Sequence, residues 1–234
     1  MHTLVSSPRN EAGTIKNASR IPMAGYAGLE SIWPATGFFA RRRTKRLKEI
    51  ECSARDIMVM GSTGFHTFVD PQGALHNVLK NCRGEAKVML LDPLREGTVV
   101  RARSIPHPDV SPELFREQII RSIDFLKGLK EAGKNVRLKL YPEAPLLKLA
   151  VLGDNLSVRF YHTGVNARNV PEYLFRQDQK NPGSLFDPFY RYFLARWSDP
   201  NIPEYDLDTD EFVYRERNGN ETRREKFSEV TMVH

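Results

Sequence analysis

The residues best suited to chemistry are cationic and imidazole side chains placed beside apolar runs. Lys148 interrupts the apolar stretch 147–152, and a lysine in such a strand needs a carboxylate, a phosphate or a route to water. His66 follows the apolar run 57–60, and His162 follows a later one. A histidine at such a position can be a general acid or base, or it can be a hydrogen-bonded structural side chain. Both interpretations stay open.

Small and basic residues close to these positions in the sequence are of the types that bind anions. The segment Gly61-Ser62-Thr63-Gly64 offers backbone amides and hydroxyls, although no Gly-Lys-Ser/Thr follows that would make it a Walker A loop. The loop expected after the strand 87–91 carries three arginines: Arg95, Arg101 and Arg103. Arginine makes bidentate contacts to phosphate, so this loop is a candidate binding segment. Solvated surface charge is the alternative.

Apolar patterning predicts the elements that position these residues. The expected strands are 57–60, 87–91, 135–141, 147–152 and 156–161, and the expected helices are 38–54, 73–82, 111–130 and 185–197. Ser111-Pro112 is a good helix start, because serine caps and proline fits the first turn. Gly153-Asp154-Asn155 joins two strands at hairpin spacing.

This order of elements predicts an α/β fold. The expected sheet is mixed and mostly parallel, with a late antiparallel hairpin and helices on both faces. Ligands of such sheets bind at the carboxyl ends of the strands. We therefore expect segments 62–66, 92–103 and 141–148 to lie close together.

Composition shifts divide the chain into three parts. Residues 1–37 are an irregular N-terminal arm, 38–198 the α/β domain, and 199–234 a C-terminal tail or hairpin turning at Asn218-Gly219. The net charge is +6, with much of the excess in 41–48. That run is either the solvated face of a helix or a surface that contacts phosphate.

Other bulk features narrow the function classes. No run of about 18 apolar residues occurs, so no membrane span is expected. Cys52 and Cys82 lie in no Cys-x-x-Cys or Cys/His pattern, so neither a metal site nor a cofactor is predicted. Two reduced thiols favour a cytoplasmic location.

The stretch from Ile57 to Trp197 resembles one half of a phospholipase D-like enzyme. The signature of that superfamily is His-x-Lys-x4-Asp, and the corresponding segment here runs from Pro145 to Asp154. Lys148 matches the lysine, Leu146 stands where the histidine belongs, and Asp154 is one residue late. The turn ending in Asn166 matches the family's following turn loosely.

A degenerate, ligand-sensing branch of that fold gives a second resemblance. Its motifs are matched here by Met60-Gly61-Ser-Thr, Leu90-Leu91-Asp92-Pro93 and Phe193-Leu-Ala-Arg-Trp197. In the active family a histidine attacks phosphorus, a second histidine protonates the leaving group, and lysine and asparagine stabilise the charge. Enzymes with one half-site obtain the second histidine by dimerising. The resemblance therefore implies an anion site built from Lys148 and Asn166.

Three functions follow as hypotheses. The first is a sensor or pseudoenzyme that binds a phosphate-bearing ligand, such as a nucleotide or phosphodiester, through Ser62, Thr63, Lys148, Asn166 and the three arginines. The second is an active phosphodiesterase or nuclease that acts as a dimer and uses His66 and His162. The third is an interaction protein that docks a partner through residues 1–30 and 201–234. Nucleic acid is a further possible partner of the first two.

Overall fold

The computed structural model describes residues 27–33, 56–166, 169–178, 180 and 183–227. The helix expected at 38–54, its basic run 41–48, Cys52 and most of the N-terminal arm lie outside these residues. The strands are β1 Leu29–Trp33, β2 Ile57–Met60, β3 Glu85–Leu91, β4 Asn135–Tyr141, β5 Leu147–Leu152, β6 Asn155–Phe160, β7 Glu172–Arg176, β8 Glu204–Asp206, β9 Glu211–Arg215 and β10 Glu221–Lys226. The helical elements are η2 Phe65–Val69, α3 His76–Asn81, α4 Glu96–Arg103, α5 Pro112–Glu131 and α6 Phe186–Trp197.

The described strands form one sheet in the order β1-β7-β6-β5-β2-β3-β4-β8-β9-β10. The α/β class is confirmed, but the mostly parallel arrangement is wrong. Only β2–β3 and β3–β4 are parallel, and every other neighbouring pair in this sheet is antiparallel. Short turns join β5 to β6, β8 to β9 and β9 to β10, and strands joined in this way have to be antiparallel.

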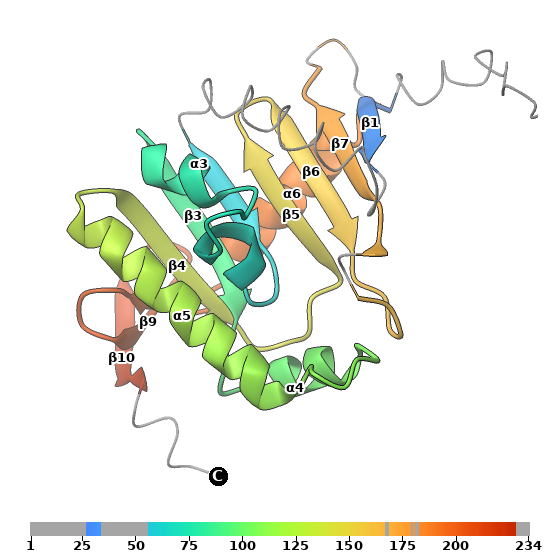
Figure 1. Cartoon of the computed structure of the whole chain (residues 1–234). Helices are drawn as coiled ribbons and strands as arrows, with labels where there is room; N and C mark the ends of the chain where they lie inside the picture. Colours follow the sequence, from blue (N-terminus) through green and yellow to red (C-terminus); the bar gives the residue numbers. More distant parts are fainter. Residues whose placement is uncertain (1–26, 34–55, 167–168, 179, 181–182, 228–234) are drawn as a thin grey trace, which may run out of the picture.

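Helical elements cover the two faces of the sheet. In Figure 1, η2, α3 and α5 lie in front of the sheet and α6 crosses behind it. Helix α5 begins as expected, since the Ser111 hydroxyl accepts a hydrogen bond from the Leu114 amide at 3.1 Å. Helix α6 buries the aromatic rings of Phe186, Phe193 and Trp197. No helix in the described ranges is both long and apolar enough to cross a membrane.

The C-terminal residues continue the same sheet. Strand β8 pairs with β4, and β9 and β10 form a hairpin across the Asn218-Gly219 turn. The described part of residues 199–234 therefore contains the hairpin. Within the segment 201–234 that was expected as a docking arm, residues 204–206, 211–215 and 221–226 are strand.

The direction of β5 decides which side chains meet. Because β5 runs antiparallel to β2, its first residues lie beside the last residues of β2, with Leu149 opposite Met60. Its hairpin partner β6 then ends at the same edge. The ends of β2, β3, β4 and β6 and the start of β5 therefore meet at one edge of the sheet.

Candidate functional site

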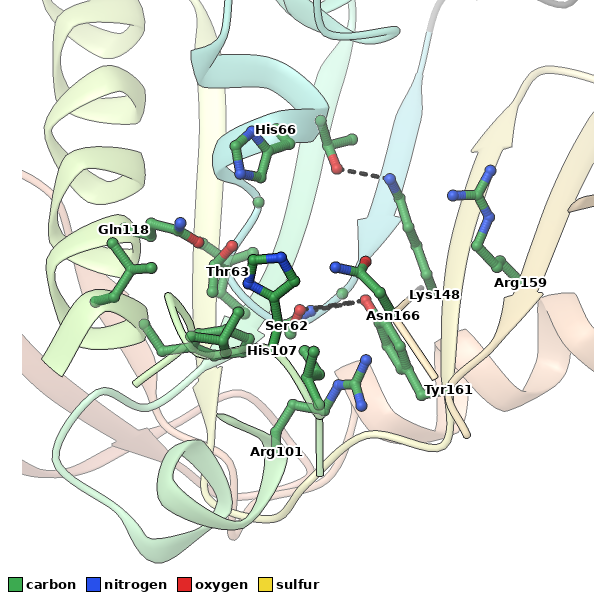
Figure 2. A pocket seen from close by; sticks show the side chains of 18 of the residues that line it. Ser62, Thr63, His66, Arg101, His107, Gln118, Lys148, Arg159, Tyr161 and Asn166 are labelled. Carbon is green, nitrogen blue, oxygen red and sulfur yellow. Dashed lines mark hydrogen bonds between the residues drawn. The ribbon is translucent and has the colours of Figure 1, made fainter. Parts of the chain in front are cut away.

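A cleft of about 330 Å³ lies at this edge. The loop after β2, the end of α4, the start of α5 and the strands β5 and β6 line it (Figure 2). Its polar and titratable lining residues are Ser62, Thr63, His66, Thr67, Arg101, His107, Asp109, Gln118, Lys148, Arg159, Tyr161 and Asn166. The volume is at the lower end of the range for small-molecule sites.

Buried contacts hold the loop after β2 in place. Tyr141 donates a hydrogen bond to the Gly61 carbonyl at 2.6 Å, and Ser122 donates to the Thr63 carbonyl at 2.7 Å. Burial raises the pKa of the Tyr141 hydroxyl well above its ordinary value, so this group stays protonated as the donor. Gly64 has φ +76°, and a Cβ there would lie 2.5 Å from the Phe68 ring. Only glycine fits this turn without displacement.

Lys148 extends from β5 into the cleft. Its ammonium donates a 2.6 Å hydrogen bond to the Thr67 hydroxyl, which η2 presents (Figure 2). The carboxylates of Glu143 and Asp92 have other partners. Glu143 pairs with Arg196, and Asp92 accepts from the Leu94 amide at 2.9 Å. Burial raises the pKa of the Asp92 carboxyl.

Arg159 lies directly opposite Lys148 in the β5–β6 pair. Its side chain is 8% exposed and pairs with Glu172 at 3.2 Å, and Glu172 is 4% exposed. Like charges opposite each other on neighbouring strands normally destabilise the pair. The Glu172 carboxylate, which pairs with Arg159, offsets that repulsion.

Arg101 is the most deeply buried cation of the cleft, at 4% exposed. Its guanidinium stacks over the Tyr161 ring with 4.3 Å from Cζ to the ring centroid, and it donates to the Ser104 hydroxyl at 2.6 Å. Its buried Nε has no hydrogen-bond partner among the described residues. Burial lowers the pKa of Arg101, but an arginine still stays charged at neutral pH.

Tyr161 joins Arg101 to the loop after β2. Its hydroxyl accepts the Ser62 amide hydrogen at 3.1 Å and lies 3.4 Å from the Ser62 hydroxyl. In Figure 2 the ring stands between Arg101 and the side chain of Asn166. Tyr161 therefore fixes both a cation and a backbone amide at the base of the cleft.

Only part of the predicted set lines the cleft. The structure places Ser62, Thr63, His66, Arg101, Lys148 and Asn166 there, and it places Arg95, Arg103 and His162 elsewhere. The arginine-rich segment is not a loop, because residues 96–103 form helix α4. Arg95 precedes this helix and lies 3.6 Å from Asp92, while Arg103 faces solvent.

His162 lies outside the cleft. Strand β6 ends at Phe160, two residues earlier, and the His162 ring is exposed. His66 is also exposed but lies on the cleft, with its Nδ1 4.0 Å from Asp70. His107 lines the cleft as well, although the sequence shows only a histidine between two prolines in a loop.

Arg159 and Tyr161 are functional candidates that sequence reasoning missed. The signal was present in the hairpin, because the turn Gly153–Asp154 pairs Leu152 with Asn155 and so pairs Lys148 with Arg159. Following that register would have placed a second cation beside the first. Of the phospholipase D-like signature positions, only Lys148 lines the cleft. Leu146 is 70% exposed, and Asp154 lies in the turn at the far end of β5.

A metal centre has no candidate ligand set in the part of the chain that the structure describes. No group of three or more His, Cys, Asp or Glu side chains there is arranged to hold an ion. The chemistry available to the cleft is that of cations, hydroxyls, amides and imidazoles. These groups bind and polarise anions.

Comparison with known proteins finds matches among solved structures at low sequence identity. No family model matches the chain, and no curated protein does. The archaeal chromatin protein TrmBL2, whose structure shows a novel mode of DNA binding, is similar with a TM-score of 0.43 and 16% identity. The match covers 76% of this chain and 54% of that one.

The phosphatidylserine synthase of Haemophilus influenzae Rd KW20 is similar with a TM-score of 0.43 and 11% identity. That match covers 65% of this chain and 35% of the synthase. The chain thus spans about half and about a third of the two proteins. No family is shown by these matches, and the function has to be inferred from the cleft.

Proposed function

We propose that the cleft binds a phosphate-bearing ligand in a phospholipase D-like domain that lacks the nucleophilic histidine. One observation carries the proposal. Arg101, Lys148 and Arg159 come from three different elements and converge on one cleft. Among its described lining residues the only carboxylate is Asp109, whose side chain is 86% exposed.

The surroundings of these cations suit a phosphate. Arg101 is held by stacking on the Tyr161 ring and lines the cleft, and the hydroxyl-bearing residues Ser62, Thr67 and Tyr161 line it as well. Charge-assisted hydrogen bonds from arginine and lysine are the strongest that proteins make to phosphate oxygens. Leu146, in place of the family's nucleophile, favours binding over the family's reaction.

A thermal-shift titration with inorganic phosphate tests this proposal. We expect phosphate to raise the melting temperature of the wild type, and Lys148→Met to abolish the rise. Lys139→Met is the matched control, because Lys139 is also half-buried but donates to the backbone carbonyls of Asp199 and Ile202, outside the cleft. An equal rise in Lys148→Met and wild type would refute the role of Lys148.

A second candidate function is phosphodiester hydrolysis. It is favoured by the presence of both His66 and His107 in the cleft, each with a carboxylate near Nδ1, at 4.0 Å for Asp70 and 3.7 Å for Asp109. Water would form the new P–O bond and lose a proton to one imidazole. The other imidazole would protonate the alkoxide as the old P–O bond breaks.

For this second function, His66→Asn and His107→Asn should each slow hydrolysis of the dinucleotide TpT, whose alkoxide leaving group needs a proton, about 10²- to 10⁴-fold. His162→Asn should leave the rate unchanged, because that ring lies outside the cleft. Absence of turnover in the wild type, or full activity in both cleft variants, would rule out hydrolysis and leave ligand binding as the proposed function. The homodimer, the nucleic-acid partner and a partner docked through the termini stay predictions.

A further inference from the structure

The cleft has two chemically different walls. Strands β5 and β6 and the end of α4 supply the cations and Tyr161 described above. A second wall of the cleft is apolar and comes from the α4–α5 connection and the first turns of α5. It consists of Ile105, Val110, Leu114 and Phe115. Ile105 and Phe115 belong to a small apolar cluster with Ala102, and Val110 packs against it.

A bare phosphate would leave Val110 and Leu114, the partly exposed residues of this apolar wall, facing water. A water molecule takes up about 30 Å³ in the liquid, so the 330 Å³ cleft has room for a ligand much larger than a five-atom phosphate group. Contact with an apolar, preferably flat, organic group would remove that wall from solvent. The volume of the cleft and its apolar lining residues therefore both favour a phosphate ester over free phosphate as the ligand.

Polar groups on the helical side suit a flat heterocycle. Gln118 lies one turn after Leu114 on α5, and its carboxamide can both donate and accept a hydrogen bond. The imidazole of His107 lies on the same side in Figure 2. Such groups beside an apolar surface bind the ring and the polar edge of a base.

We propose that the ligand is a nucleoside monophosphate, a deepening that rests on the phosphate site proposed above. Its phosphate contacts Arg101 and Lys148. Its base lies against Val110 and Leu114, with the Gln118 carboxamide at the edge of the ring.

Isothermal titration with three probes separates the two levels of the proposal. Inorganic phosphate tests the anion site, ribose 5-phosphate adds the sugar, and the four ribonucleoside 5′-monophosphates add the base. We expect at least one nucleoside monophosphate to bind roughly tenfold or more tightly than ribose 5-phosphate, since stacking of a base contributes an effect of that size. Equal affinities for these two probes would overturn the nucleotide inference while leaving the phosphate site intact. No binding of any probe would overturn the phosphate site itself.

Variants of helix α5 locate the base. Leu114→Gln should erase the preference for the nucleotide over ribose 5-phosphate, while Ile120→Gln on the same helix should keep it. Ile120 is 37% exposed and does not line the cleft, so it controls for the change in polarity. Gln118→Leu is a second probe that keeps the wall apolar and should change the ranking of the four bases. An unchanged preference in Leu114→Gln together with an unchanged ranking in Gln118→Leu would contradict the placement.

Discussion

Glu172→Ala is expected to lower the free energy of unfolding by about 3–5 kcal/mol, because it removes the carboxylate that pairs with the buried Arg159 guanidinium. Arg159 and Glu172 are 8% and 4% exposed and 3.2 Å apart. With alanine at 172, Arg159 would keep the cost of its lost hydration without the facing carboxylate. For a chain of this size the melting temperature should fall by roughly 6–20 °C. Urea unfolding followed by circular dichroism measures the effect.

Asp187→Ala is the matched control for this prediction. Asp187 and Arg191 are also 3.2 Å apart, but their side chains are 56% and 79% exposed. Such a surface pair contributes at most about 1 kcal/mol. If Glu172→Ala costs no more than Asp187→Ala, the buried pair is not the support of the cationic wall that its geometry indicates. Replacing both partners, as in Arg159→Met with Glu172→Leu, should recover much of the loss.

Gly97→Ala is expected to have the second large effect, by displacing α4. A Cβ at Gly97 would lie 2.2 Å from the Pro142 carbonyl oxygen and 2.7 Å from the Ala144 nitrogen, both backbone atoms that cannot rotate away. The helix would have to move from the segment after β4, where the Gly97 amide now donates to Pro142 at 3.0 Å. Overpacking of this kind costs about 1–3 kcal/mol or more. Since α4 carries Arg101, phosphate binding should weaken with stability.

Gly128→Ala separates this clash from a general effect of replacing glycine. Gly128 lies within α5, and a Cβ there would meet nothing within 4 Å. Alanine should therefore stabilise the helix by about 0.5–1 kcal/mol. The two glycine variants are thus expected to change stability in opposite directions, measured by the same urea titration. A Gly97→Ala protein as stable as wild type would show that α4 is not held in place by close backbone contact.

The apolar runs predicted five of the ten described strands, β2 to β6, and both long helices of the described chain. The local signal at Ser111-Pro112 predicted the start of α5, and Asn218-Gly219 lies at the turn of the β9–β10 hairpin, which was one of two alternatives for this segment. Strand direction could not be predicted in this way, because an apolar run reads the same whether its neighbours are parallel or antiparallel. The incorrect prediction of a mostly parallel sheet follows from this limit.

Helix α4 shows why part of the site was missed. Its sequence contains Gly97 and the β-branched residues Thr98, Val99 and Val100, which have low helix propensity, so a loop was the natural prediction. Tertiary contacts with the segment after β4 override that preference. Only in a helix does Arg101 turn into the cleft while Arg103 turns to solvent.

The histidines illustrate the same limit. Alternation predicts a buried His162 only if the strand continues that far, and β6 ends at Phe160. His107 carries no local signal that would place it on the cleft. Lys148, in contrast, was identifiable because a lysine in an apolar strand must be compensated whatever the topology.

Direct titration of Arg101→Met with inorganic phosphate is the most decisive test of an anion-binding cleft. Arg103→Met is the control, since it removes the same charge from the same helix on its exposed side. We predict that Arg101→Met weakens phosphate binding about tenfold to a hundredfold, because this change in affinity corresponds to the free energy of one charge-assisted hydrogen bond. Arg103→Met should bind phosphate like the wild type. Equal affinities of the two folded variants, or no binding of phosphate by the wild type, would contradict the proposed function.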